Sequence, residues 1–347
     1  MDDRPLELGE IPQVVGFCVV PACRFQEGHT ELAQPRNQGR RAGVVESIQQ
    51  PGTDALRRTL RRRLWPLIPV TVNGGGTEMK IDADKFYRMP LIMGPLAALH
   101  DPTASKIPYK QVEVVALQYQ TDPAAIRSLL PDCYRPAKDP TVTVIFGYND
   151  KLEFMAGGGY RLAAVQVAAI FDGEQDHVEG DYVLVMFEDQ TWPIIGGRED
   201  LGIPKLYADI SPITLLPDNH LRCEASLWGH LLFAIELSPQ KNQNAVVRLA
   251  ATRMINARPM LAYKYIPSLH GPPDASYPTV SKNDTKVRDL WFSESGKVAF
   301  GDAGFDDTAY SSLVINALKS LRVVKFERAL HYRGSAVLRY DLSRRLR

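Results

Sequence analysis

The sequence is short of long apolar runs, of cysteine and of net charge, and each shortage excludes a class of protein. No apolar run approaches the roughly 20 residues that cross a bilayer, so we expect no membrane span. The formal net charge of +1 gives no reason to expect nucleic acid as a partner. The 4 cysteines include no C-x-x-C pair, which favours reduced thiols. An acidic segment, MDDRPLELGE, stands where a secretory signal would be basic, and together these features predict a cytoplasmic protein.

The motifs of nucleotide, zinc and serine-hydrolase sites are also missing. There is no G-x-G-x-x-G after a strand pattern, no G-x-x-x-x-G-K-[ST], no H-E-x-x-H and no G-x-S-x-G. The glycines at 157–159 precede no helical pattern, so we interpret them as a turn. The acidic stretch 172–179 could hold a cation, although a solvated turn is the more common structure for such a stretch. We therefore predict no cofactor and no metal.

The first 80 residues differ in composition from the rest. Residues 26–43 are rich in Arg, Gln and Gly and show no apolar period, which predicts a poorly ordered N-terminal extension over 1–80. Within it, residues 53–68 predict a short basic amphipathic helix, with leucines on one face and arginines on the others. Such a helix can rest on the main domain, or it can dock a partner protein or a membrane surface. We place the main domain at 81–347.

The main domain is predicted to be α+β, built mainly from antiparallel strands with a few flanking helices. Short runs rich in Val, Ile, Tyr and Phe, such as TVTVIFGY and DYVLVMFED, are separated by Pro, Gly, Asp and Asn. Frequent strands of this kind favour a closed or strongly curled sheet. One helix is expected to begin with Asp122 as N-cap and Pro123 in its first turn, and to end at Pro131. A second is expected from about Asp307.

Lys205 raises the chemical question in this sequence. It lies between Pro204 and Leu206 in the mostly apolar segment LGIPKLY. An ordinary lysine amine, with a pKa near ~10.4, is protonated at neutral pH and is a poor nucleophile. A dry pocket disfavours the charged form, and a free amine can condense with a ketone to give an iminium. The local sequence also leaves the alternative of an ordinary solvated lysine.

A longer motif around this lysine resembles the acetoacetate decarboxylase family. From Gly180 the chain runs GDYVLVMFEDQTWPIIGGREDLGIPK, and the family signature has G-D-Y, a strand, G-R-E and P-K at the same separations. The resemblance spans roughly residues 85–345. Flanking segments that agree with the family are MPLIMGPL at 89–96, YQTDPAAIRSLLP at 119–131, DPTVTVIF at 139–146 and RPMLAYKYIP at 258–267.

The resemblance implies a fold and a mechanism. Members of the family have a cone-like closed β-barrel, form oligomers and use the matching lysine to make a Schiff base with a β-keto acid. Loss of carbon dioxide leaves an enamine, which is protonated and hydrolysed to a ketone. The resemblance therefore implies a homo-oligomeric carbon–carbon lyase with Lys205 as its catalytic residue. Arg198 and Glu199 match G-R-E, either as catalytic groups or as a structural ion pair that fixes the lysine loop. Tyr182 is expected to line the pocket, or only to pack.

Four positions depart from the family pattern. The true decarboxylases, the standard example of lysine activation by desolvation or an adjacent cation, have a second lysine where this chain has Leu206. Only the desolvation route is then left. The family's carboxylate-handling arginine aligns near Val112, with Lys110 close by, and its two pocket glutamates align near Ile145 and Leu162. These apolar replacements indicate a larger and more apolar keto substrate than acetoacetate.

Three hypotheses for function follow. The leading one is a Schiff-base lyase in which Lys205 decarboxylates a β-keto acid, for which a polyketide-derived acid of secondary metabolism is one source. The second hypothesis is an enzyme that uses the same lysine and enamine for an aldol condensation–dehydration or a cyclisation. The third is a non-catalytic carrier of apolar ligands, with Lys205 as a remnant. In the first two, Tyr160 and Arg161 are candidates for acid–base or anion contacts at the pocket mouth.

Overall fold

The computed structural model describes residues 80–96, 105–238 and 240–347. The predicted extension up to residue 79, with its basic helix, lies outside the described residues. Within these ranges, no helix is both long enough and apolar enough to cross a membrane.

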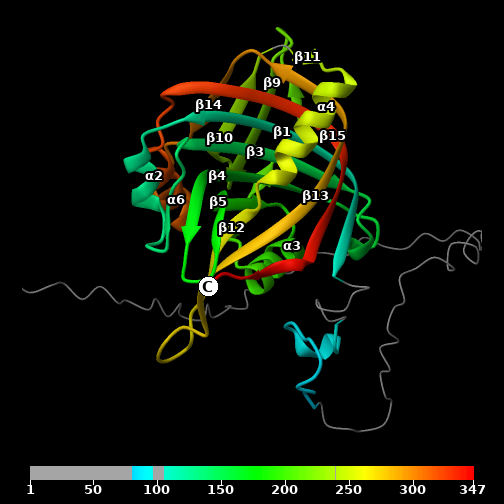
Figure 1. The fold of residues 1–347 in the computed structure, drawn as a ribbon, viewed down its shortest axis with the longest axis vertical. Helices are drawn as coiled ribbons and strands as arrows, with labels where there is room; N and C mark the ends of the chain where they lie inside the picture. Colours follow the sequence, from blue (N-terminus) through cyan, green and yellow to red (C-terminus); the bar gives the residue numbers. More distant parts are fainter. Residues whose placement is uncertain (1–79, 97–104, 239) are drawn as a thin grey trace, which may run out of the picture. The chain divides into compact units, whose positions relative to one another are not determined.

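Ten of the described strands form a sheet that closes on itself (Figure 1). The pairing runs β4-β3-β1-β15-β13-β12-β5, and β5 pairs again with β4, which completes a ring. Most neighbours are antiparallel, but β5 pairs in parallel with β6 and with β12. The predicted closed, mainly antiparallel sheet is confirmed. The ten strands are β1 (Lys106–Gln120), β2 (Tyr134–Pro136), β3 (Thr141–Asp150), β4 (Tyr160–Asp172), β5 (His177–Glu188), β6 (Lys205–Tyr207), β11 (Gln240–Asn242), β12 (Met260–Ile266), β13 (Ala275–Ser293) and β15 (Lys325–Arg345).

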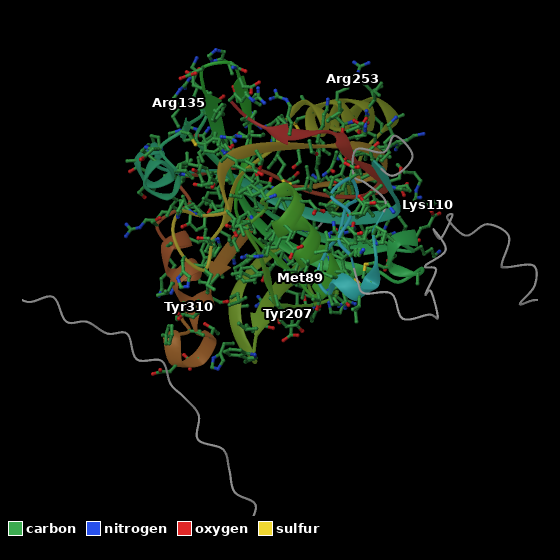
Figure 2. All side chains as sticks on the ribbon, turned by 90° about the horizontal axis from the view of Figure 1, so that it is seen from below. Met89, Lys110, Arg135, Tyr207, Arg253 and Tyr310 are labelled. Atoms are coloured by element: carbon green, nitrogen blue, oxygen red, sulfur yellow. The ribbon has the colours of Figure 1, made fainter. Side chains whose placement is uncertain are left out.

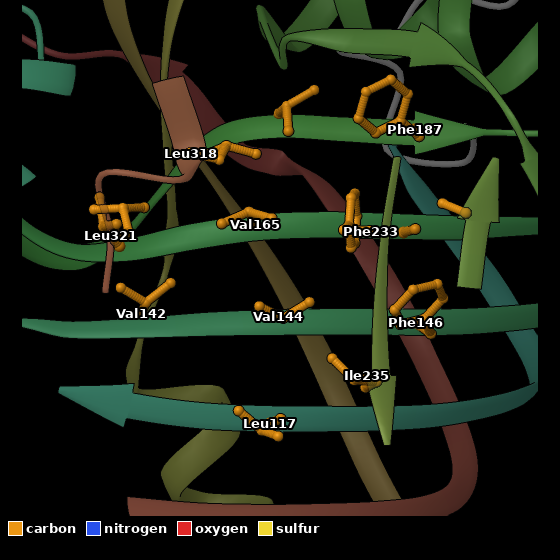
Figure 3. Packing of buried hydrophobic residues seen from close by; sticks show 14 of the residues in the cluster. Leu117, Val142, Val144, Phe146, Val165, Phe187, Phe233, Ile235, Leu318 and Leu321 are labelled. Carbon is orange, nitrogen blue, oxygen red and sulfur yellow. The ribbon is translucent and has the colours of Figure 1, made fainter. Parts of the chain in front are cut away.

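A second sheet packs against one face of the ring. It contains β7 (Asp209–Ile210), β8 (Thr214–Leu215), β9 (Leu221–Leu227), β10 (His230–Leu237) and β14 (Gly296–Phe300). Phe233 of β10 lies between the rings of Phe146 and Phe187, with centroid distances of 5.5 and 6.0 Å (Figure 3). Alternate residues of each ring strand enter this core, because side chains alternate between the two faces of a strand. The other face is left for the site.

The helices follow the sequence signals in part. α2 (Pro123–Leu129) begins where predicted, and the Asp122 carboxylate accepts a 2.8 Å hydrogen bond from the Ala124 amide. The predicted second helix is broken at Ala309, where φ is 47°, into α5 (Phe305–Thr308) and α6 (Tyr310–Leu318). The turn predicted at 157–159 is confirmed between η3 (Glu153–Met155) and β4. The remaining helices are η2 (Leu91–Met93), α3 (Thr191–Gly196), the π-helix η4 (Gly197–Leu201) and α4 (Ala245–Ala257).

The connection from β5 to β6 positions the lysine. Parallel strands cannot be joined by a tight hairpin, so the chain crosses over through α3 and η4 before it returns beside β5. The returning strand begins at Lys205, which pairs with Met186. The motif that looked like a loop before the lysine is therefore a compact helical cover over it.

Candidate active site

Lys205 is a buried lysine whose amine is held by two acceptors. Its side chain is 8% exposed. Nζ donates to Glu188 Oε1 at 2.7 Å and to the Pro193 carbonyl oxygen at 2.9 Å. One acceptor is the last residue of β5, and the other lies in α3. The crossover and the strand that precedes it thus fix the amine from two sides.

Glu188 is a carboxylate that the solvent does not reach. Its relative exposure is 0%, and Oε2 has no hydrogen-bond partner among the described residues. Burial raises the pKa of the Glu188 carboxyl, and the neighbouring Lys205 charge opposes that rise. The Glu188 side chain lies two positions after Met186 in β5, so both project to the face of the sheet on which Lys205 of β6 lies.

The helical cover leaves room for the lysine only because residue 197 is glycine. A Cβ on Gly197 would lie 2.3 Å from Lys205 Cε and 2.7 Å from Nζ, far inside contact distance. Arg198 fixes the same residue through its backbone, since Nη1 donates to the Lys205 carbonyl oxygen at 2.9 Å. The cover ends at Gly202, whose φ of 74° suits a left-handed helix cap.

Two tyrosine hydroxyls lie near the buried pair. Tyr109 Oη and Tyr160 Oη are 3.2 Å apart. Burial raises the pKa of Tyr109 to about 12, and it holds the pKa of Tyr160 well above the usual range. The Glu188 charge adds to both increases. Both phenols therefore stay protonated at neutral pH, as hydrogen-bond donors.

A cavity of about 460 Å³ lies within the ring, beside these groups. Its wall is contributed by β1, β3, β4, β5, β12, β13, β15 and α4. Met186, the strand partner of Lys205, and Leu162, the partner of Glu188, both line it. Tyr109 and Tyr160 line it as well. The lysine is not itself a lining residue, so its Nζ lies just behind this wall.

The strand register sorts the cavity wall into rows of different chemistry. The row level with Lys205 runs Ala116, Ile145, Ala164 and Met186, all apolar, and each of them except Ala164 lines the cavity. Two residues further along the strands lies the row Gln118, Thr143 and Gln166, in which Gln118 Nε2 donates to Thr143 Oγ1 at 3.1 Å. A ligand whose carbonyl reaches the lysine would thus meet apolar side chains level with that carbonyl and hydrogen-bonding groups two residues along the strands.

Comparison with known proteins identifies the family. A sequence model described as acetoacetate decarboxylase matches residues 88–343. The chain belongs to the acetoacetate decarboxylase family. An acetoacetate decarboxylase of Chromobacterium violaceum is 34% identical over 109 residues, which cover 31% of this chain and 42% of the relative. The chain spans 42% and 66% of the length of the first two curated decarboxylases that it matches.

Solved structures of acetoacetate decarboxylase-like proteins share the fold. The acetoacetate decarboxylase of Legionella pneumophila superposes with a TM-score of 0.56 at 20% identity, covering 69% of this chain and 86% of the other. The enduracididine biosynthesis enzyme MppR, complexed with the condensation product of pyruvate and imidazole 4-carboxaldehyde, gives a TM-score of 0.51 at 18% identity, with 69% and 88% coverage. The predicted acetoacetate decarboxylase-like barrel is therefore confirmed.

The three polar positions that this chain replaces are close together in the structure. By the resemblance, the family's arginine and two glutamates align near Val112, Ile145 and Leu162, and these three residues all line the cavity. Lys110, the nearby cation, points outward instead, where it pairs with Glu153 at the surface (Figure 2). The cavity wall beside Lys205 is therefore apolar where the acetoacetate decarboxylase pattern is charged.

Of the other sequence-predicted site residues, Tyr160 lies at the cavity wall and three lie elsewhere. Arg161 projects to the opposite face of β4, where Nη1 donates to the Ile210 carbonyl oxygen at 2.9 Å. Tyr182 packs in the main core, its ring 4.8 Å from that of Tyr134. Leu206 packs against the same core, because it follows Lys205 in the strand and faces away from it.

The G-R-E segment is built differently from the expected ion pair. Arg198 is exposed and Glu199 is partly exposed, and no ion pair joins them within the described ranges. The charge that fixes this segment is Asp200, whose side chain is 3% exposed and pairs with Arg88. Tyr340 Oη donates to the same carboxylate at 3.3 Å. Sequence reasoning missed this pair because Arg88 lies more than a hundred residues away.

The acidic stretch 172–179 uses its carboxylates in ion pairs. Asp172 contacts His177 and Arg135, and Asp176 binds Arg344 Nη2 at 2.6 Å. In the described part of the chain, no three His, Cys, Asp or Glu side chains are grouped as ligands for a metal ion. These side chains therefore give no reason to place a cation at this turn.

Proposed function

We propose that this protein is a Schiff-base-forming lyase in which Lys205 attacks the keto carbon of a β-keto acid and the resulting iminium drives decarboxylation. The observation that carries the proposal is the buried amine of Lys205 beside a cavity, in a chain of the acetoacetate decarboxylase family. The iminium is an electron sink, so the bond to the carboxylate carbon breaks toward it and leaves an enamine.

The cavity wall supports a substrate larger and more apolar than acetoacetate. An apolar row lies level with the lysine, and the hydrogen-bonding row of Gln118, Thr143 and Gln166 follows it. The proposed substrate has an apolar segment next to its keto group and oxygen or nitrogen atoms beyond it. A polyketide-derived β-keto acid of secondary metabolism fits this description.

The test is trapping with borohydride. The full chain is incubated with a β-diketone or β-keto acid, reduced, and searched by mass spectrometry for an adduct on the Lys205 peptide. We expect that adduct in the wild type, its loss in Lys205→Arg, and release of carbon dioxide from the β-keto acid. Lys110→Arg is the matched control, because it changes an exposed lysine in the same way. A folded wild type that forms no adduct with any keto probe would contradict the proposal.

The second candidate is an aldol condensation–dehydration or a cyclisation through the same enamine. It is favoured by one observation, the apolar identity of Val112, Ile145 and Leu162 in the cavity wall, since these side chains offer no charge to a substrate carboxylate. MppR, with its bound condensation product, supports such chemistry on this fold. Adduct formation on Lys205 without carbon dioxide release, together with consumption of an added aldehyde, would favour this candidate.

The non-catalytic carrier differs from both in its dependence on Lys205. It predicts that Lys205→Ala leaves ligand affinity almost unchanged, whereas a lyase loses turnover completely. The cytoplasmic location and the homo-oligomer remain predictions. Light scattering on the purified full chain would test the assembly, and a monomer at micromolar concentration would contradict it.

A further inference from the structure

Glu188 is the acidic neighbour of Lys205, and its two carboxylate oxygens have different surroundings. Oε1 lies 2.7 Å from Lys205 Nζ, while Oε2 is buried without a hydrogen-bond partner in the described part of the chain. An unsatisfied carboxylate oxygen in the interior is unfavourable, because its lost hydration is not replaced. Buried groups of this kind are rare in folded proteins and call for a functional explanation.

The surroundings oppose the ionised form of this carboxylate. Burial and the neighbouring Asp189 carboxylate raise the pKa of Glu188, and the Lys205 ammonium lowers it, burial being the largest effect. α3 contributes no titratable group. The elements around the pair also carry other charged or titratable side chains, among them Tyr109 of β1, Tyr160 and Arg161 of β4, Arg198, Glu199 and Asp200 of η4, Tyr207 of β6, Tyr263, Lys264 and Tyr265 of β12, and Tyr340 of β15.

Little positive charge is left to stabilise the Glu188 anion apart from Lys205 itself. Asp200 is already paired with Arg88, and Arg198 meets only the backbone carbonyl of Lys205. The two phenols near the carboxylate are neutral. In such a low-dielectric site, a neutral amine beside a neutral carboxylic acid becomes competitive with the ion pair.

We propose that Glu188 is the catalytic acid–base that takes a proton from Lys205 Nζ and delivers it to the leaving hydroxyl during Schiff-base formation. The inference rests on the proposed role of Lys205 as the nucleophile. Proton transfer from Nζ to Oε1 needs no solvent, and the pair keeps one proton throughout. Glu188 thereby replaces the second lysine of the family pattern as the group that makes the amine nucleophilic.

The atoms balance through the step. The free amine adds to the keto carbon, forming the N–C bond, and one amine proton moves to the carbonyl oxygen. The protonated Glu188 then gives its proton to the hydroxyl, which leaves as water as the N=C bond forms. The products are an N-protonated iminium, a Glu188 carboxylate and one water, with the same net charge as the starting pair and ketone.

The experiment measures how the reactivity of Nζ depends on pH. The full chain is treated with limiting acetic anhydride between about pH 6 and 9, the interval between ordinary carboxyl and amine titrations. Mass spectrometry then follows acetylation of the Lys205 and Lys110 peptides, and the borohydride-trapped keto adduct is measured over the same range. An internal proton transfer predicts an almost flat profile for wild-type Lys205. An amine that exchanges its proton with solvent gains about tenfold in rate per pH unit below its pKa, and the exposed Lys110 peptide is the internal reference.

Three variants separate proton transfer from a structural role. Glu188→Gln keeps the size but accepts no proton, so acetylation of Lys205 should become pH-dependent. The rate of keto-adduct formation at neutral pH should fall by at least about tenfold, because no acid remains to protonate the leaving hydroxyl. Glu188→Asp keeps the acceptor, so its profile should stay flat at a lower rate. Glu153→Gln breaks the exposed pair with Lys110 and should leave the Lys205 profile unchanged.

The outcomes distinguish this inference from the proposed function. A steep wild-type profile, or parallel profiles for the wild type and Glu188→Gln, overturns the role of Glu188 even where a keto adduct forms. A flat acetylation profile without any keto adduct supports the shared proton and removes the Schiff-base function. If Glu188→Gln does not fold, the wild-type and Glu188→Asp profiles still decide the matter.

Discussion

The environment of Lys205 combines two effects that act in opposite directions. Burial disfavours an ammonium ion, whereas a carboxylate 2.7 Å away favours it. The amine donates to Glu188 and to the Pro193 carbonyl, two contacts that a free amine can keep while its lone pair stays available. In the proposed lyase, this geometry holds the amine in place before the substrate binds.

Gly197→Ala should displace the Lys205 side chain without changing any proposed reacting group. The new Cβ would lie 2.3 Å from Lys205 Cε, so the lysine side chain must move. A displacement of about 1 Å at a reacting atom can lower the rate by about 100-fold. We expect a loss of that size in the rate of borohydride-trapped adduct formation, with the folded circular dichroism spectrum retained.

The matched control is Gly304→Ala. Its Cβ would meet only Asp307 Oδ2, at an ordinary 3.7 Å. This variant should trap the keto probe at the wild-type rate. Equal rates in the two variants would mean that the lysine has room to move, and that Gly197 has no special role.

The sequence predicted the lysine but not its partner. Lys205 could be found because the G-D-Y, G-R-E and P-K spacing is local. Glu188 ends the apolar run VLVMFE, where a carboxylate ordinarily marks the exposed end of a strand. Its contact with Lys205 depends on the parallel register of β5 and β6, which the intervening crossover sets. Pairing of this kind is tertiary information that a local pattern does not contain.

At the scale of elements, a buried ion pair holds the helical cover of α3 and η4 over the lysine. Asp200 of η4 pairs with Arg88, which belongs to the segment 80–96. The Asp200 side chain is 3% exposed and that of Arg88 is 17% exposed. Burial raises the pKa of Asp200, and Arg88 opposes that rise. The segment 80–96 thus contributes to the site although it carries none of the reacting atoms.

Arg88→Met should destabilise this cover. It leaves the Asp200 carboxylate buried without its cation, and removing one partner of a buried pair costs about 3 kcal/mol or more. Protonation of Asp200 limits the loss, so we expect about 2–4 kcal/mol in the free energy of unfolding. Urea denaturation measures it, and hydrogen exchange should rise most over residues 191–201.

Arg135→Met provides the comparison for this pair. Arg135 and Asp172 form an ion pair that is 55% and 48% exposed, at the edge of the molecule (Figure 2). Water replaces such a contact readily, so its loss should leave the midpoint of unfolding almost unchanged. A loss of stability as large as that of Arg88→Met would show that burial of the pair is not what matters.

Element prediction succeeded where the signal was local and failed where it was not. α2 begins at its predicted cap because Asp122 and Pro123 act on their own helix. The segment 222–237 has residues typical of strands, but it forms the hairpin of β9 and β10, because Trp228 and Gly229 adopt φ values of 53° and 84° at its turn. α4 was missed because its buried stripe is narrow: only Ala251 is fully buried, while Val246 and Leu249 are exposed.

At the scale of the whole molecule, several tyrosine side chains are buried in the two sheets. The sequence contains 14 tyrosines. Burial is the main cause of a raised pKa in Tyr109, Tyr119, Tyr134, Tyr148, Tyr160, Tyr182, Tyr332 and Tyr340. These residues come from both faces of the ring, the core that meets the second sheet and the cavity side. Their ionisation is therefore coupled to the integrity of the barrel as a whole.

The free energy of unfolding should consequently fall steeply above about pH 10. The pKa of Tyr109 in the folded state is about 12, above the unfolded value near ~10. The unfolded chain loses these protons first, so the stabilisation is complete below about pH 10 and is lost as the pH rises through the folded values. Each buried phenol adds up to about 1.4 kcal/mol per pH unit to the slope.

A pair of tyrosine variants isolates this effect. Tyr332 is buried, and burial alone raises its pKa, so Tyr332→Phe removes one titrating group and should flatten the alkaline slope. Tyr310 is 74% exposed, and Tyr310→Phe should leave the slope at its wild-type value (Figure 2). Urea unfolding at several pH values measures both slopes. If Tyr332→Phe keeps the full wild-type slope, Tyr332 ionises in the folded barrel as readily as in the unfolded chain, and its burial does not couple ionisation to unfolding.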